Sequence, residues 1–168
     1  RNFNTTLGAV VRESLPAYSR KKTRTMGRVG ILAAAATEDA LKDAGFLESP
    51  DLTNGRTGVA CGTSGGAFPA MEDMARFIAE KDMVNLKGST YPLLMPHSAA
   101  VNLSIFFGVT GMVIATSVAC ASGSQALCYG RDAILLGRED AMICCGAEEF
   151  SPFSAGVFDA LFQTSPGT

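Results

Sequence analysis

The sequence predicts a layered α/β fold, in which a sheet of short buried strands is covered by helices on both faces. Short apolar runs alternate along the chain with segments whose apolar residues recur at helical spacing, which is typical of this class. The chain has 168 residues, 47% hydrophobic and 18% charged, which suits one domain with a large core. No apolar run reaches the roughly 20 residues of a membrane-spanning helix, so we expect no membrane contact.

The first half of the chain contains two predicted helices and one strand. Residues 27–45 are rich in alanine and end in glycine, a common helix terminator, so they predict a helix. Residues 57–62 (TGVACG) form a short apolar run that predicts a buried strand. Residues 65–82 place apolar side chains at helical spacing with charges on the other side, which predicts an amphipathic helix.

The second half contains two further predicted strands. Residues 85–99 carry two prolines and predict irregular structure. The remaining pattern predicts a short helix over residues 99–107, a strand over 111–119, a helix of small residues over 120–137 and a strand over 140–149.

Positive charge is concentrated at the start of the chain. Residues 1–30 hold seven basic groups and one acidic, whereas residues 31–168 hold seven basic and fifteen acidic. Most of the excess lies in the run SRKKTRTMGR, which includes Lys21 and Arg24. Such a run is either a solvated face or a docking surface for an acidic partner. Nucleic acid is not the expected partner, because the pI is about 5.4 and no aromatic residues interleave with the basic ones.

The five cysteines predict neither a disulfide framework nor a metal site. They are Cys61, Cys120, Cys128, Cys144 and Cys145, with no C-x-x-C pair and no Cys/His spacing suited to zinc. We recognise no secretory signal and therefore expect a reducing cytoplasm, and no motif requires a cofactor. Cys144 and Cys145 lie in the apolar run DAMICCG, which favours core packing over redox chemistry.

Cys120 is the first candidate nucleophile, because it lies where an apolar strand gives way to a helix of small residues (TSVACASGS). The free N–H groups and partial positive charge of a helix N-terminus favour a thiolate and can bind the oxyanion formed when a thioester is attacked. The small residues around Cys120 leave room for a substrate carbonyl. A cysteine packed beside a tight turn would have the same pattern, so both interpretations stay open.

Ser64 is the second candidate, since GTSGG at residues 62–66 fits the G-x-S-x-G pattern of serine hydrolases. Such a serine needs a histidine base oriented by a carboxylate, and the only histidine, His97, follows it by 33 residues in a proline-rich segment. A close strand-to-helix turn also explains these glycines. We therefore favour a structural turn, and for His97 a helix-start or core position.

Several ordered motifs resemble the N-terminal half of the β-ketoacyl-[acyl-carrier-protein] synthases, or ketosynthases. The motifs are SRKKTRTM, VACGTSGG, PLLMPHSAAVNLSIFFGVTG, TSVACASG, CCGAEE and FDAL, spread over residues 18–164. The resemblance implies a thiolase-like α/β/α architecture, with residues 1–168 as a partial domain, the N-terminal half of a duplicated fold. It also implies a cytoplasmic acyltransferase of fatty-acid or polyketide-like biosynthesis that uses no cofactor.

The resemblance assigns a role to three site positions. Cys120 matches the cysteine that accepts the acyl group as a thioester, with its own backbone N–H as one oxyanion donor. Gly65 and Phe158 match positions that line the acyl pocket. The whole enzyme would then condense the acyl group with malonyl-carrier, losing carbon dioxide, to give a 3-oxoacyl product.

The resemblance also implies two partners. Lys21 and Arg24 match basic positions that engage the acidic acyl carrier protein, which favours the docking surface over the solvated face. The strand at about residues 112–118 matches the strand through which the family forms homodimers.

Some features of the family are not recognisable in residues 1–168. The opening strand is not apparent in residues 1–17, and the chain has no H-G-T segment, no G-H-x-x-G-A run and no active-site lysine. His97 matches neither histidine of the decarboxylation step, so we expect no condensing activity from these residues alone. The alternatives are a non-condensing partner subunit, which typically lacks the nucleophile, and a serine hydrolase that uses Ser64. A thiolase relative also stays open, although the basic docking positions favour carrier-bound substrates.

Overall fold

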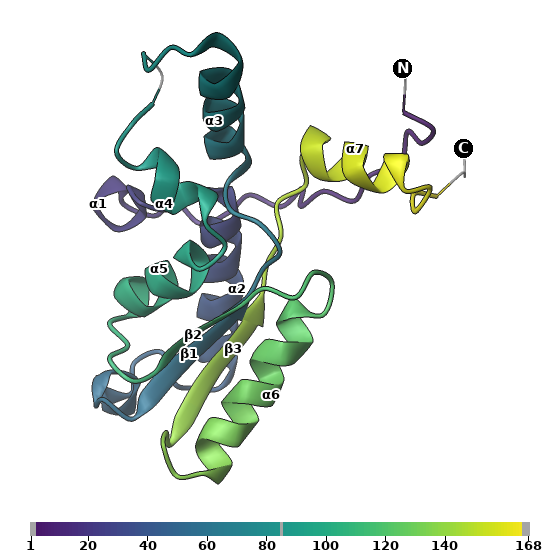
Figure 1. Cartoon of the computed structure of the whole chain (residues 1–168). Helices are drawn as coiled ribbons and strands as arrows, with labels where there is room; N and C mark the ends of the chain where they lie inside the picture. Colours follow the sequence, from purple (N-terminus) through teal and green to yellow (C-terminus); the bar gives the residue numbers. More distant parts are fainter. Residues whose placement is uncertain (1–2, 85, 166–168) are drawn as a thin grey trace.

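The computed structural model describes residues 3–84 and 86–165 and has three layers (Figure 1). The middle layer is a parallel sheet with strand order β2-β1-β3, formed by β1 (Thr57–Gly62), β2 (Val113–Thr116) and β3 (Ala141–Gly146). Helices α2 (Arg28–Asp43) and α5 (Ser98–Phe107) cover one face, and α6 (Ser122–Leu135) covers the other. The predicted layered α/β class is therefore confirmed.

Small side chains let the helices approach the sheet closely. On the α2 face, Ala33 and Ala34 are buried with Val59 of β1 and Leu103 of α5 in the hydrophobic core. On the opposite face, a Cβ atom at Gly130 of α6 would lie 2.2 Å from the Cys144 sulfur. Cys144 therefore packs directly against the backbone of α6, as its apolar sequence context predicts.

The structure corrects the prediction that residues 85–99 are irregular. Within this segment, of which residue 85 lies outside the described residues, Thr90–Leu94 form the short helix α4. Pro92 lies in the first turn of α4, where a missing N–H costs no helical hydrogen bond. Proline content therefore limited the length of this helix without preventing it.

Three predicted boundaries also change. The strand expected over residues 111–119 is regular only over Val113–Thr116. Before it, the Met112 N–H donates to the Glu139 carboxylate (2.6 Å), and the Gly111 N–H instead reaches the Thr57 carbonyl of β1 (3.1 Å); after it, the backbone turns at Ala119 (φ 52°). For the same reason the helix expected from residue 120 begins at Ser122. The last strand ends at Gly146 instead of residue 149.

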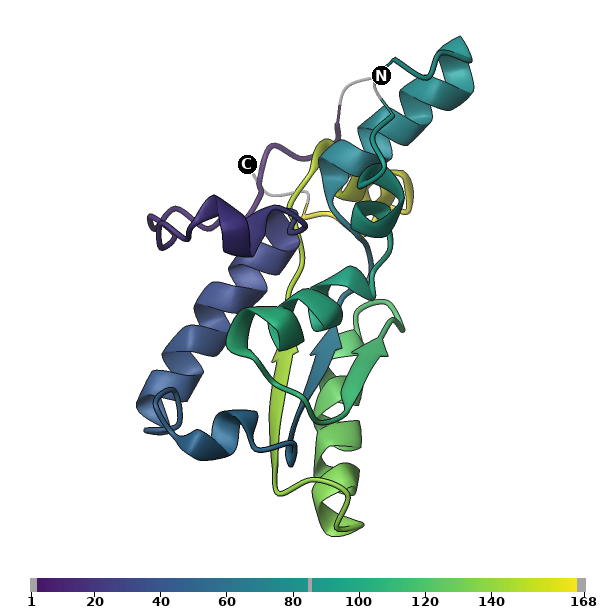
Figure 2. The ribbon, with the colours of Figure 1, turned by 90° about the vertical axis from the view of Figure 1, so that its left-hand side faces the viewer.

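Four elements lie on the periphery of this layered body. Helix α3 (Phe68–Glu80) agrees with the predicted amphipathic helix and extends away from the sheet beside α4 (Figures 1 and 2). The basic run forms the single-turn helix α1 (Arg20–Thr23), and Pro50–Thr53 form a 3-10 turn. Helix α7 (Pro152–Ala160), which the pattern did not predict, begins with a capping box between Ser151 and Ser154.

No helix or strand precedes α1 among the described residues, and the segment before it runs beside α7 (Figure 1). The backbone N–H of Asn4 donates to both carboxylate oxygens of Asp159 (2.9 and 3.1 Å), and its side chain donates to one of them (2.9 Å). These contacts join the start of the chain to α7. Over the described residues, no helix combines the length and apolar character needed to cross a membrane.

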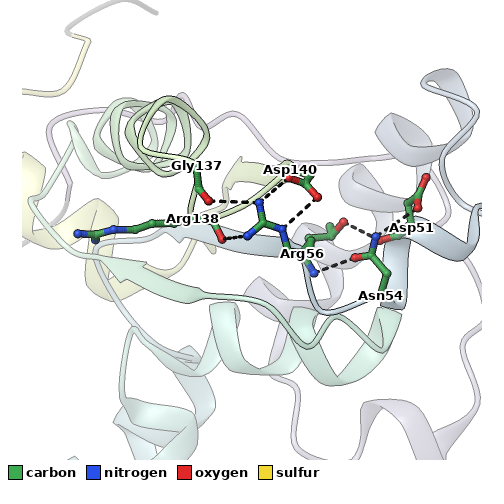
Figure 3. Close-up of polar contacts among 7 residues, drawn as sticks. Asp51, Asn54, Arg56, Gly137, Arg138 and Asp140 are labelled. Carbon is green, nitrogen blue, oxygen red and sulfur yellow. Dashed lines mark hydrogen bonds and ion pairs between the residues drawn. The ribbon is translucent and has the colours of Figure 1, made fainter.

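Arg56, which precedes β1, ties the loop between α6 and β3 to the amino-terminal end of the sheet (Figure 3). Its guanidinium donates to both oxygens of Asp140 (2.6 and 3.0 Å) and to the carbonyls of Gly137 and Arg138 (both 3.2 Å). Its backbone N–H donates to the side chain of Asn54 (2.8 Å). This cluster lies at the amino-terminal ends of β1 and β3, at the opposite end of the sheet from the carboxyl ends of the strands.

Candidate active site

The carboxyl ends of the three strands lie at the same end of the sheet, the end from which α3 and α7 extend (Figure 2). A cavity of about 380 Å³ opens there, between the turn that follows β1, the turn that follows β2 and the segment that follows β3. Ser64, Cys120, Glu148 and Phe158 all line it. Ligands commonly bind at this edge of parallel sheets, so the cavity is the candidate site.

Cys120 is held on a strained turn between β2 and α6. Ala119 has the left-handed φ of 52° that non-glycine residues rarely adopt, and Cys120 follows it with an exposed side chain. The buried Ser122 side chain donates to the Ala119 carbonyl (2.6 Å) and accepts from the Val118 N–H (2.9 Å). These bonds stabilise a turn that presents the thiol to the cavity at the start of α6.

Three glycines allow this turn to approach the sheet. A Cβ atom at Gly62, the last residue of β1, would lie 2.3 Å from the backbone carbonyl of Ser122. A Cβ atom at Gly146, the last residue of β3, would lie 3.2 Å from the Cα atom of Gly123. The first turn of α6 therefore lies directly against the ends of two strands.

The turn after β1 forms another wall of the cavity, and a carboxylate from the segment after β3 holds it. Glu148 accepts the backbone N–H of Ser64 (2.9 Å), and the hydroxyls of Ser64 and Thr63 also donate to it. Thr63 also donates to the Gly65 carbonyl (2.9 Å). No sequence pattern assigned a role to Glu148, although two consecutive acidic residues close to the end of a buried strand were a usable signal.

The serine-hydrolase alternative lacks its histidine in this geometry. The Ser64 hydroxyl donates to a carboxylate, whereas His97 is exposed directly before α5 and does not line the cavity. A serine nucleophile requires a base within hydrogen-bond reach of its hydroxyl, usually histidine. The turn interpretation of the GTSGG pattern accounts for these contacts, and His97 lies at a helix start as expected.

The other predicted site residues lie in three places. Phe158 reaches the cavity from α7. Gly65 follows the cavity-lining Ser64, and a Cβ atom added at Gly65 would lie nearest to Met71 and Glu148. Lys21 in α1 and Arg24 directly after α1 are exposed, which leaves both charges available to a partner.

The remaining thiols differ from Cys120 in their surroundings. Cys61 of β1 is 1% exposed and lies in register with Cys145 of β3. A hydrogen bond to Cys145, together with burial, raises the pKa of the Cys61 thiol above its ordinary value. Burial likewise raises the pKa of Cys144. Over the residues that the structure describes, no three His, Cys, Asp or Glu side chains gather in a way that could hold a metal ion.

Comparison with known proteins agrees with this geometry. The family described as "Beta-ketoacyl synthase, N-terminal domain" matches residues 7–167. The chain is 34% identical over 152 residues to nodulation protein E of Rhizobium leguminosarum bv. trifolii, covering 89% of this chain and 37% of that protein. It is 32% identical over 162 residues to 3-oxoacyl-[acyl-carrier-protein] synthase 2 of Vibrio cholerae, covering 95% and 39%.

A solved structure gives the same result for the fold. A β-ketoacyl synthase from Burkholderia phymatum aligns with 99% of this chain and 41% of its own, at a TM-score of 0.93 and 40% identity. The chain thus spans less than half the length of these relatives. The thiolase-like architecture expected from the resemblance is confirmed, and the chain belongs to the β-ketoacyl synthase family, of which it matches the N-terminal domain.

Proposed function

We propose that this chain provides the acyl-accepting part of a 3-oxoacyl-[acyl-carrier-protein] synthase. The observation that carries the proposal is the exposed Cys120 thiol, held by a strained turn at the start of α6 and facing a cavity. The Cys120 thiolate attacks the carbonyl carbon of a carrier-bound acyl thioester. The carrier thiol then leaves, and the acyl group stays on Cys120 as a new thioester.

The second step forms the carbon–carbon bond. Malonyl-carrier loses carbon dioxide, and the resulting carbanion attacks the acyl-Cys120 carbonyl, which yields the 3-oxoacyl-carrier and frees the thiol. The amide N–H of Cys120 supplies one hydrogen-bond donor for the carbonyl oxygen that becomes negatively charged. Dividing the reaction in this way replaces one difficult step with two easier ones.

Residues 1–168 do not supply all of this machinery. Their only histidine, His97, does not line the cavity, whereas decarboxylation and proton transfer need acid–base groups near the thioester. Since the chain spans 37% to 41% of the relatives' length, we propose that it acts as one part of a longer ketosynthase polypeptide.

Two partners follow from the same proposal. Exposed Lys21 and Arg24 suit an acidic carrier protein, and the carrier is part of the name of the Vibrio cholerae relative. A homodimer formed along β2 is supported by the exposed Val113 on an edge strand with one unpaired side. We place the enzyme in the cytoplasm, where free thiols stay reduced.

Acyl transfer to the thiol tests the proposal. The full-length protein is incubated with octanoyl-carrier protein, and intact-mass and peptide analysis locate the acyl group. We expect acylation of Cys120, loss of it in Cys120→Ala and no loss in Cys128→Ala, which removes another exposed thiol. An acyl group on Ser64 would support the hydrolase alternative, and a protein without acyl transfer would agree with a non-condensing subunit.

A further inference from the structure

Two consecutive glutamates after β3 hold the turn that follows β1, although they lie more than 80 residues from it in the chain. We propose that Glu148 is a positioning residue: its carboxylate fixes Ser64 in the wall of the cavity that Cys120 also lines, and thereby sets which acyl chains reach the thiol. The effect on acyl chains rests on the proposed function, whereas the role of Glu148 in holding the cavity wall rests on the geometry alone.

The contacts of Glu148 are directed to the turn. One carboxylate oxygen accepts the Ser64 N–H at 2.9 Å, the Ser64 hydroxyl and the Thr63 hydroxyl at 3.5 Å. Over residues 3–84 and 86–165, Glu148 forms no ion pair with a basic side chain. Its charge is therefore stabilised by hydrogen-bond donors of the turn. The Thr63 N–H donates instead to the Thr116 carbonyl of β2 (3.2 Å), so within the turn it is Ser64 that Glu148 holds.

The far end of the turn is anchored independently. Glu149 accepts the Phe68 N–H at the start of α3 (3.2 Å), and the Ala67 N–H donates to the Leu93 carbonyl of α4 (2.8 Å). A Cβ atom at Gly66 would lie 2.2 Å from the Leu94 carbonyl, so residue 66 is held tightly against α4. Loss of Glu148 would therefore free Ser64 and Gly65, while Thr63 stays bonded to β2 and α3 keeps its own anchors.

Gly65 lies between the Glu148 carboxylate and Met71 of α3, and it directly follows the cavity-lining Ser64. A Cβ atom at Gly65 would lie 3.1 Å from the Met71 methyl group and 3.8 Å from the second oxygen of Glu148. Gly65 and Met71 do not line the cavity themselves, but a shift of the preceding Ser64 also moves the backbone at residue 65. Since one methylene of misfit changes discrimination by roughly tenfold or more, a shifted wall alters the preference between short and long chains.

The rate at which Cys120 is alkylated reports on the shape of this cavity wall and requires no catalysis. In the full-length protein, the rates of Cys120 modification by N-ethylmaleimide and by N-octylmaleimide are measured by peptide mass analysis. We expect Glu148→Ala to change the ratio of the two rates on the order of tenfold. Glu148→Gln keeps an oxygen acceptor for the Ser64 N–H, so it should retain a ratio close to that of the unmodified protein.

Two further variants separate positioning from general loss of structure. Glu80→Ala removes an exposed carboxylate at the end of α3, away from the cavity and the turn, and should leave the ratio unchanged. Glu148→Asp keeps the charge but shortens the reach, so an intermediate ratio is expected even if the alanine variant fails to fold. An unchanged ratio in both Glu148→Ala and Glu148→Asp would overturn the inference.

The same variants are then assayed with acetyl- and octanoyl-carrier protein. If the ratio of Cys120 acylation rates shifts together with the maleimide ratio, the assignment of chain-length control to Glu148 is supported. A maleimide shift in a protein that transfers no acyl group would contradict the proposed function while leaving the positioning role intact.

Discussion

At the scale of single residues, the five cysteines occupy distinct surroundings that chain position alone would not separate. Cys120 and Cys128 are exposed, Cys61 is buried against Cys145, and Cys144 lies over Gly130. Only Cys120 lies at a helix start that faces a cavity. Cys120 and Cys128 are both exposed, so a difference in their reactivity should come from their location and not from their exposure.

We predict that Cys120 is the first thiol to react with limiting iodoacetamide near neutral pH. Cys120 is exposed and lines an open cavity, whereas burial and the raised pKa of Cys61 keep that thiol protonated and inaccessible. Peptide mapping after short labelling measures the order, with exposed Cys128 in the middle of α6 as the internal reference. Preferential labelling of Cys61 or Cys145 would contradict the prediction.

Gly62 is a second residue whose role lies in its lack of a side chain. Its Cβ atom would meet backbone atoms of Ser122 at 2.3 Å, and backbone cannot move aside as a flexible side chain can. We predict that Gly62→Ala lowers the free energy of unfolding by about 1–3 kcal/mol. Gly88→Ala, where a Cβ meets nothing within 4 Å, is the control and should change it by less than about 0.5 kcal/mol. Equal urea midpoints for the two variants would refute this.

At the scale of elements, the Arg56 cluster joins β1 to the loop before β3. The carboxylate of Asp140 raises the pKa of Arg56, and the guanidinium lowers the pKa of Asp140 below its ordinary value of 3.8. Because the folded pKa of Asp140 is depressed, its contribution to stability is present above pH 3.8 and is lost as pH falls through the folded value. Both side chains are largely exposed, so the contribution is small.

We predict that Arg56→Met lowers the melting temperature by a few degrees at pH 7 and that the difference from the unmodified protein shrinks below about pH 4. Arg131→Met is the control, because among the described residues the ion-pair partner of Arg131 is its exposed chain neighbour Asp132 (3.0 Å). Thermal unfolding followed by circular dichroism at several pH values measures both variants. A difference that grows toward acid pH would show that the Asp140 pair is not responsible.

The local sequence pattern is sufficient to predict the bounds of some helices and strands but not of others. Residues 28–43 and 57–62 form the helix and strand that periodicity predicts, because each buries one continuous apolar surface. The strand around residues 113–116 is shorter than predicted, because the buried Glu139, from the distant α6–β3 loop, takes the Met112 N–H. Such a contact depends on which loops meet, and no local pattern contains that information.

At the scale of the whole molecule, the described chain exposes many large apolar side chains. On α7 alone, Phe153, Val157 and Phe158 are each more than 40% exposed. Ile105 of α5 and Leu127 of α6 are at least 60% exposed on opposite faces of the sheet. Exposed apolar surface of this extent is typical of interfaces, which agrees with the proposal that these residues act within a larger assembly.

We predict that residues 1–168 by themselves produce no 3-oxoacyl product from acyl- and malonyl-carrier proteins. Their single histidine does not line the Cys120 cavity, so the decarboxylation step lacks a histidine there. Mass spectrometry of carrier-bound products measures this, with the full-length protein as the positive control. Detection of 3-oxoacyl product from the isolated residues would show that the proposed division of the machinery is wrong.

Much of the candidate site was predictable from sequence because it follows short-range rules. Cys120 was identified from an apolar strand followed directly by a run of small residues, and the structure places it on the turn between β2 and α6. The resemblance contributed Phe158, which no periodicity would have selected, and the structure places it at the same cavity. Neither the local sequence pattern nor the resemblance assigned a role to Glu148, because its partner, Ser64, lies 84 residues earlier in the chain.

The sequence by itself determined the layered α/β class, the order of the main elements and the strand-to-helix position of Cys120. Those features depend on the spacing of apolar and small residues within one element, which is a local property. Only the tertiary structure decided that β1 lies between β2 and β3, so that the turn after β1 meets both Cys120 and Glu148. Strand order follows from how separate elements bury one shared core, and that is a property of the whole chain.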